Sequence, residues 1–200
     1  MIIRSSLRPV LGVIDSDSFD EFSSLMLSGV NSKESVLDGF DLFGRLNVPA
    51  GRYEFDRYRA EIATGVQRPL RAVLSVQDGG FFGGDRLEKF VELQWCQSAH
   101  FFVGLSFTEN DVVLPSGSFT SHLASLRMDI APNSRWSWSN LLQYDNTAEA
   151  AGINSRLRYV PEAGRELVFV LNHGAAVDAE NHFRSTKNEI NLKLSYTFRY

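Results

Sequence analysis

The chain has one cysteine, Cys96, and no run of about 18 apolar residues anywhere in its 200 positions. The single cysteine excludes a disulfide within the chain, and the lack of a long apolar run excludes a transmembrane helix. Lysine and arginine together number 20 against 24 aspartate and glutamate, and they are scattered, so no basic stripe exists for nucleic acid. The first residues also lack the continuous apolar core of a secretory signal.

Alternation of apolar and polar residues is the dominant positive feature, and it is clearest in residues 186–200. A period of two with a polar opposite face predicts a strand that is solvated on one side only. A terminal strand that ends on an aromatic residue of the apolar row is typical of bacterial outer-membrane β-barrels. That apolar row consists of Ile190, Leu192, Leu194, Tyr196, Phe198 and Tyr200.

Further alternating segments recur through the chain at intervals of roughly ten to twenty residues. Together they predict about eight regular strands and two to four less regular ones. We expect residues 48–200 to be barrel strands, and residues 1–47 to be a weakly patterned segment with further strands. The segments before the final one are 1–14, 22–30, 40–46, 53–62, 70–76, 87–95, 99–108, 119–130, 135–145, 151–160 and 165–173.

The connections between these segments are expected to alternate in length. Residues 96–98, 131–134 and 161–164 predict tight turns, whereas 78–86, 109–118 and 174–184 predict longer loops rich in Gly, Asp and Asn. Outer-membrane barrels have short periplasmic turns and longer outer loops. With Tyr200 on the periplasmic side, every tight turn would be periplasmic.

Aromatic residues gather near the predicted periplasmic strand ends, where an aromatic belt is expected at the level of the lipid headgroups. Lys89 is predicted to be the one outward charge, near the outer rim, where a charge costs about 0–1 kcal/mol rather than the roughly 2–4 kcal/mol of the midplane. The aromatic residues of this belt are Trp95, Trp136, Trp138, Tyr159 and Phe198.

Two soluble alternatives use the same pattern with the apolar rows inside. One is an antiparallel sheet that packs its apolar face into a core, and the other is a lipocalin-like barrel with an apolar ligand cavity. The polar rows carry little Lys and Glu decoration and are rich in Ser, Asn, Gln, Gly and closely spaced Arg, which favours a lumen. Apolar side chains facing outward or inward would separate these alternatives.

Five short motifs, at 48–55, 81–86, 114–119, 142–146 and 153–159, resemble the carboxy-terminal barrel region of the DUF5916 family. The first reads Val-Pro-Ala-Gly-Arg-Tyr-Glu-Phe, and the similarity covers about residues 40–200. The resemblance implies an exported envelope protein whose barrel follows an amino-terminal carbohydrate-binding-like module. Some members are labelled hydrolases. Neither that module nor an export signal is recognisable here, so we expect this chain to be the carboxy-terminal part of a longer protein.

The sequence shows no catalytic constellation. There is no Gly-x-Ser-x-Gly motif, and none of the four histidines belongs to a HExxH motif or a close metal pair. We therefore expect no catalytic residues, no metal and no cofactor. The glycines of 79–84 are expected to provide flexible turning at the outer rim.

A set of charged residues on the predicted polar rows is the candidate site. The turn at 161–164 would bring Arg158 across from Glu166 as an opposite-charge pair. In a wide barrel such residues tune channel selectivity, and in a narrow one they neutralise each other within the lumen. The set comprises Arg127, Asp129, Arg156, Arg158, Glu166, Glu189, Lys193 and Arg199.

The sequence thus predicts an all-β, antiparallel up-and-down transmembrane β-barrel, or the carboxy-terminal part of a larger one, in a Gram-negative outer membrane. We expect a non-enzymatic anchor or passage linked to an envelope carbohydrate-binding module. The alternatives are an envelope hydrolase and a soluble ligand-binding barrel. The expected partners are outer-membrane lipid, carbohydrate through the separate module, and the barrel assembly machinery, for which Tyr196, Phe198 and Tyr200 would be the signal.

Overall fold

A computed structural model describes residues 8–14, 24–42, 44–65, 68–177, 180 and 182–197. Phe198, Arg199 and Tyr200, which belong to the predicted assembly signal and charged set, lie outside these residues. No helix long and apolar enough to cross a membrane occurs in the described part of the chain.

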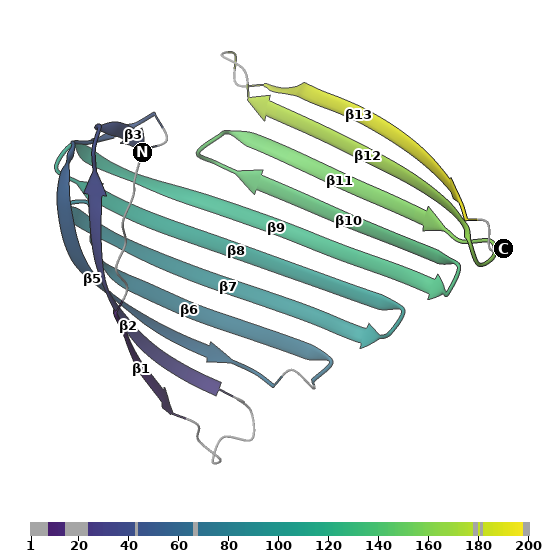
Figure 1. The fold of residues 1–200 in the computed structure, drawn as a ribbon, viewed down its shortest axis with the longest axis horizontal. Helices are drawn as coiled ribbons and strands as arrows, with labels where there is room; N and C mark the ends of the chain where they lie inside the picture. Colours follow the sequence, from purple (N-terminus) through teal and green to yellow (C-terminus); the bar gives the residue numbers. More distant parts are fainter. Residues whose placement is uncertain are drawn as a thin grey trace. The chain divides into compact units, whose positions relative to one another are not determined.

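The main sheet of the described residues has eleven strands, and every pairing resolved between them is antiparallel (Figure 1). Consecutive strands are neighbours throughout, except that β2 pairs with β5. The predicted all-β, antiparallel up-and-down fold is therefore confirmed. The strands are β1 (Arg8–Ile14), β2 (Ser24–Val36), β5 (Gly51–Ala63), β6 (Leu70–Phe81), β7 (Gly84–Ser98), β8 (Phe101–Leu114), β9 (Gly117–Asn133), β10 (Trp136–Asp145), β11 (Ala150–Tyr159), β12 (Arg165–Val177) and β13 (Phe183–Tyr196).

The chain forms two compact units, which are described separately. Unit 1 consists of Met1–Val91 and Thr108–His122, and unit 2 consists of Glu92–Phe107 and Leu123–Tyr200. Strands β7, β8 and β9 contribute residues to both units.

The connections do not alternate between tight and longer as predicted. Phe82 and Gly83 alone join β6 to β7, and Pro115 and Ser116 alone join β8 to β9. Most of residues 78–86 and 109–118 are therefore strand rather than loop. Their polar side chains have partners across the strands, which turn composition does not reveal. Arg86 Nε, for example, donates to Asn110 Oδ1 over 2.9 Å.

Of the glycines predicted to provide turning, Gly83 lies in the turn between β6 and β7, whereas Gly79 and Gly84 lie in the strands themselves. Gly79 has a φ of +146°, and a Cβ there would collide with the Asp56 carbonyl oxygen. A Cβ on Gly84 would collide with the carbonyl oxygen of Val113 on β8. Both glycines are required because neighbouring backbones approach closely at these points.

A small hairpin interrupts the connection between β2 and β5. It consists of β3 (Phe40–Leu42), which Figure 1 labels, and β4 (Leu46–Val48), and these two strands pair antiparallel. The single strand predicted at 40–46 is wrong, because Gly44, with a φ of +66°, forms the turn between the two short strands.

This hairpin packs into a hydrophobic cluster with residues of β2, β8 and the turn after β6. Val48 is completely buried, and Ser116 Oγ donates to the Asn47 carbonyl oxygen over 2.9 Å, which fixes the hairpin to the turn between β8 and β9. The buried members of the cluster are Val36, Leu46, Val48, Phe82, Val112 and Leu114.

Candidate functional site: the two faces of the strands

The apolar rows are the more exposed side of β5 and β7, and large apolar side chains are exposed in both units. Along β7, Val91, Leu93 and Trp95 are each exposed by 38–43 %, whereas Glu92 and Gln94 between them are half-buried. The strand β5 repeats this alternation, with half-buried charged residues between exposed Tyr58 and Ile62. We call the side that carries the exposed apolar rows the apolar face, and the opposite side, with Arg59, Arg86 and Glu166, the polar face.

In unit 2 the apolar face is continuous across neighbouring strands. Trp138 of β10 lies opposite Leu157 of β11, Leu157 lies opposite Phe169 of β12, and Phe169 lies opposite Leu192 of β13. All four side chains are exposed. This arrangement is the reverse of a soluble lipocalin-like barrel, in which the apolar rows would line the interior.

One end of the apolar face in unit 2 is aromatic, as the sequence indicated. The rings of Trp136 and Tyr159 are stacked with centroids 4.2 Å apart, and Trp95 meets Phe101 edge to face at 5.5 Å. These residues flank the turns that join β7 to β8, β9 to β10 and β11 to β12. They lie at the strand ends where the sequence places the aromatic belt.

In unit 1 a charged group interrupts the apolar face of β7, β8 and β9. Lys89 Nζ lies 2.7 Å from Glu109 Oε1 and 3.3 Å from Asp111 Oδ2. Thr120 Oγ1 donates to the second oxygen of Asp111, and His122 Nε2 lies 3.2 Å from Glu109 Oε2. The prediction that Lys89 is the one outward charge is therefore wrong, because β8 continues through a segment that its composition marked as a loop.

The change from apolar to polar occurs at matching positions on β2, β5 and β6. Leu27 lies opposite Ala60, and Ala60 lies opposite Val76, which continues the apolar row. The next row contains Tyr58 and Asp78. Beyond it, polar pairs replace the apolar ones, since Asn31 Nδ2 donates to Asp56 Oδ1 over 2.9 Å and Lys33 lies 2.7 Å from Glu54. The apolar face thus ends at a definite level along these strands.

Asn140 departs from the apolar row of β10, and its neighbours explain how it is accommodated. Ser155 lies directly opposite Asn140 on β11. Trp138 Nε1 donates to Ser155 Oγ, and Ser155 Oγ donates to Asn140 Oδ1, each over 2.8 Å. These hydrogen bonds lower the cost of polar groups on an apolar surface.

The polar face of unit 2 carries the described members of the charged set, which exclude Arg199. The predicted pair between Arg158 and Glu166 is present, with 2.6 Å between Nε and Oε1. Arg127 and Asp129 form a second pair at 2.8 Å along β9. Glu189 accepts from Asn191 over 2.9 Å and lies 3.1 Å from Lys187.

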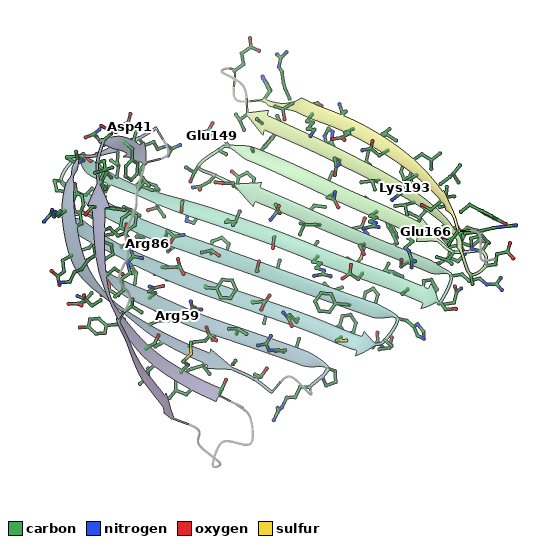
Figure 2. The ribbon with its side chains drawn as sticks, viewed as in Figure 1. Asp41, Arg59, Arg86, Glu149, Glu166 and Lys193 are labelled. Carbon is green, nitrogen blue, oxygen red and sulfur yellow. The ribbon has the colours of Figure 1, made fainter. Side chains whose placement is uncertain are left out.

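Two cations of the set have no hydrogen bond or ion pair within the described residues, namely Arg156 and Lys193. Lys193 and Glu166 lie on the adjacent strands β13 and β12 (Figure 2). Both Arg156 and Lys193 act electrostatically on Glu166, whose direct partner is Arg158. Cations therefore outnumber carboxylates around Glu166.

Sequence reasoning missed a second charged group, on the polar face of unit 1. Arg59 pairs with Glu61 at 2.6 Å, and Arg86 pairs with Glu88 (Figure 2 labels both arginines). Each pair joins residues two apart on one strand, as Arg127 and Asp129 do in unit 2. The signal was available, because an arginine followed two residues later by a carboxylate places both on one face of a strand.

Among the three residues of the predicted assembly signal, Tyr196 belongs to the described part of the chain. Tyr196 is the last residue of β13, and its side chain is 52 % exposed. Arg165 Nη2 donates to its hydroxyl over 3.3 Å, and the guanidinium lies 4.9 Å from the ring centroid. Phe198 and Tyr200 lie outside the described residues.

His100, His173 and Cys96 each contact a backbone or amide oxygen rather than one another. His100 Nδ1 contacts the Ala131 carbonyl oxygen at 2.7 Å, His173 contacts Asn188, and Cys96 Sγ lies 3.7 Å from the Ser98 carbonyl oxygen. Within the described ranges, no three or more His, Cys, Asp or Glu side chains are grouped so that they could hold a metal ion.

No family model matches the chain, and no curated protein matches it. Among solved structures, the chain is similar to a NanC porin determined in a rhombohedral crystal form, with 14% sequence identity and a TM-score of 0.37. That match covers 96% of this chain and 100% of the porin chain.

Proposed function

We propose that this chain is the membrane-embedded β-barrel part of an outer-membrane protein and acts as an anchor or passage without catalysis. The observation that carries the proposal is the exposure of apolar rows on strands of both units, together with half-buried charged residues opposite them on β5 and β7. Water does not favour such a surface, because exposed apolar area is unfavourable by about 25 cal/mol per Å². Lipid would remove this cost for side chains such as Leu93, Leu192 and Phe169.

The dimensions and borders of the apolar face support the same proposal. On β8 it extends from Phe101 to Phe107, about 20 Å along the strand at roughly 3.3 Å per residue. Outer-membrane barrels have an apolar band about 25 Å tall. Aromatic residues lie at one end of the row and Glu109 and Asp111 follow at the other, as expected where lipid gives way to headgroups and water.

Backbone hydrogen bonding adds a further requirement. A membrane-spanning sheet has to satisfy all of its backbone groups, which requires a closed ring of strands. We propose that the strands described here contribute to such a ring, with the polar face toward its lumen. The anchored module would be the carbohydrate-binding-like domain implied by the resemblance to the DUF5916 family, and the barrel assembly machinery would recognise Tyr196, Phe198 and Tyr200.

Heat modifiability tests the proposal. The chain is expressed with a signal peptide, outer membranes are isolated, and boiled and unboiled samples are compared by electrophoresis. A membrane-bound protein whose unboiled band migrates faster is the expected result, since closed barrels resist detergent until they are boiled. A soluble periplasmic protein without a shift would contradict the proposal. Deletion of Tyr200 without loss of membrane assembly would contradict the proposed signal.

A further inference from the structure

Two guanidinium groups flank one aromatic ring on the polar face of unit 1. Arg57 on β5 and Arg86 on β7 lie 5.2 Å and 5.6 Å from the ring centroid of Phe81. Phe81 ends β6, the strand between them. Arg57 also lies 4.6 Å from the ring centroid of Phe55. The two rings thus hold two like charges close together, an arrangement that attracts anions.

The partners of the two arginines differ. Arg86 is hydrogen-bonded to Glu88 and to Asn110 Oδ1. Arg57 donates from Nε to the Gly80 carbonyl oxygen over 3.2 Å and makes no ion pair within the described residues. Its two terminal nitrogens are therefore available as a planar fork, the geometry that matches carboxylate and phosphate oxygens. The carboxylates that act on Arg57 electrostatically are Glu34 and Glu88, and only Glu88 has an arginine partner.

A pocket of about 140 Å³ adjoins Arg86. Its polar lining comes from Arg86, Asn110 and Ser121, and its apolar wall from Val112 and Phe119. Val112 belongs to the buried cluster of the β3–β4 hairpin, and Phe119 packs against that cluster. The apolar wall excludes water from one side, which strengthens hydrogen bonds between charged groups. The volume suits a single carboxylate or phosphate group rather than a whole sugar ring.

We propose that Arg57 and Arg86 form a binding site for the carboxylate or phosphate group of a small anionic solute, beneath the β3–β4 hairpin. Arg86, Asn110 and Ser121 line the pocket. Arg57, which lies beside the same Phe81 ring as Arg86, would supply the free fork from the β5 side. The biological role of this site rests on the proposed function as a passage, and the site would define the class of solute that passes. Binding itself can be measured without a membrane.

The test is isothermal titration calorimetry of the full chain, refolded in detergent, with citrate and with inorganic phosphate at constant chloride concentration. Saturable binding of at least one anion is expected. Binding of citrate alone or of phosphate alone would show whether the site prefers a carboxylate or a phosphate group. The variant R57Q should weaken binding by about tenfold or more, because it removes charge-assisted hydrogen bonds. The variant R57K should also weaken binding, because an ammonium group cannot form the fork.

Two further variants complete the design. The variant R135Q removes the same charge from a turn between β9 and β10 and should leave binding unchanged. The variant E34Q removes a competing carboxylate, keeps both arginines, and should tighten binding. If neither Arg57 variant folds, the change in anion affinity of E34Q tests the site instead. Absence of binding to the unaltered chain, equal binding by R57Q, or unchanged binding by E34Q would each overturn the site.

The outcomes are separable from those of the membrane test. A normal heat-dependent shift without anion binding would overturn only the site. Anion binding by a soluble chain that shows no shift would overturn only the membrane role.

Discussion

Arg158 and Glu166 form an ion pair across β11 and β12, with 2.6 Å between Nε and Oε1, although they are not opposite each other in the ladder. Arg158 lies opposite Val168, and Glu166 lies opposite Ser195 on the next strand. The contact is diagonal, a distance that long side chains can span. It leaves Glu166 as the carboxylate among the cations Arg156, Arg158 and Lys193.

The variant E166Q should therefore make a passage lined by the polar face more selective for anions, because it removes a negative charge from a surface where cations are in excess. The measurement is the reversal potential in planar bilayers under a salt gradient. The matched control is E54Q, which also loses a carboxylate that has a cationic partner, here Lys33, but lies on the opposite face, beyond the apolar residues. Equal shifts in the two variants would contradict the assignment of faces.

A charge on the apolar face should be far more costly than the same charge one residue away. The variant L192R would place arginine on an exposed apolar row, and the expected cost is about 2–4 kcal/mol if that row lies near the bilayer midplane. The variant N191R places arginine on the polar face of the same strand and should cost less than about 1 kcal/mol. Guanidinium unfolding of each variant in lipid vesicles gives the free-energy differences. A soluble sheet would tolerate L192R as well as N191R.

The end of the apolar face on β8 can be located by spin labelling. In a C96S background, cysteine replaces Phe107, Glu109 or Asp111 in turn and receives a nitroxide label. Oxygen, which partitions into lipid, should relax the label at 107 most strongly, whereas a water-soluble nickel complex should relax the label at 111 most strongly. The crossover between them would mark the border of the bilayer. Similar accessibility to the nickel complex at all three positions would contradict a membrane border there.

The β3–β4 hairpin should depend on its buried leucine. Leu46 is 5 % exposed within the hydrophobic cluster, and L46A should destabilise the protein by about 2–5 kcal/mol, as buried leucine truncations do. Leu37 is 70 % exposed in the same connection, and L37A should change stability by no more than about 0.5 kcal/mol. Denaturant unfolding of both variants provides the comparison. A small effect of L46A would show that the hairpin is not held by this cluster.

Gly84 should not tolerate a side chain, because its Cβ would meet the Val113 carbonyl oxygen across β7 and β8. We expect G84A to cost more than about 1 kcal/mol and to reduce the yield of folded protein. Gly152 is the control, since a Cβ there would meet nothing nearer than the His173 carbonyl oxygen at 4.0 Å. Refolding yields and unfolding midpoints of G84A and G152A can be compared directly.

The sequence predicted the strands well because alternation is a local property. The row from Ile190 to Tyr196 and the charged row that contains Arg156 and Arg158 need no knowledge of any other strand, since successive side chains of an extended chain point to opposite faces. For the same reason the sequence indicated an apolar surface with aromatic residues at one end. The ion pair between Arg158 and Glu166 was also predictable, because a short connection joins their two strands.

The positions of the turns between β6 and β7 and between β8 and β9 were decided only by tertiary structure. Glu109 and Asp111 have the composition of a loop, yet they extend β8 because Lys89 on β7 and Thr120 on β9 provide partners for them. The β3–β4 hairpin likewise depends on the buried contacts of Leu46 and Val48. The contacts of Arg57 and Arg86 with the Phe81 ring require that the neighbouring strands β5, β6 and β7 align these three residues. Alternation assigns each residue to a face, but cross-strand pairing sets its neighbours, and those neighbours determine where strands end and which charges meet.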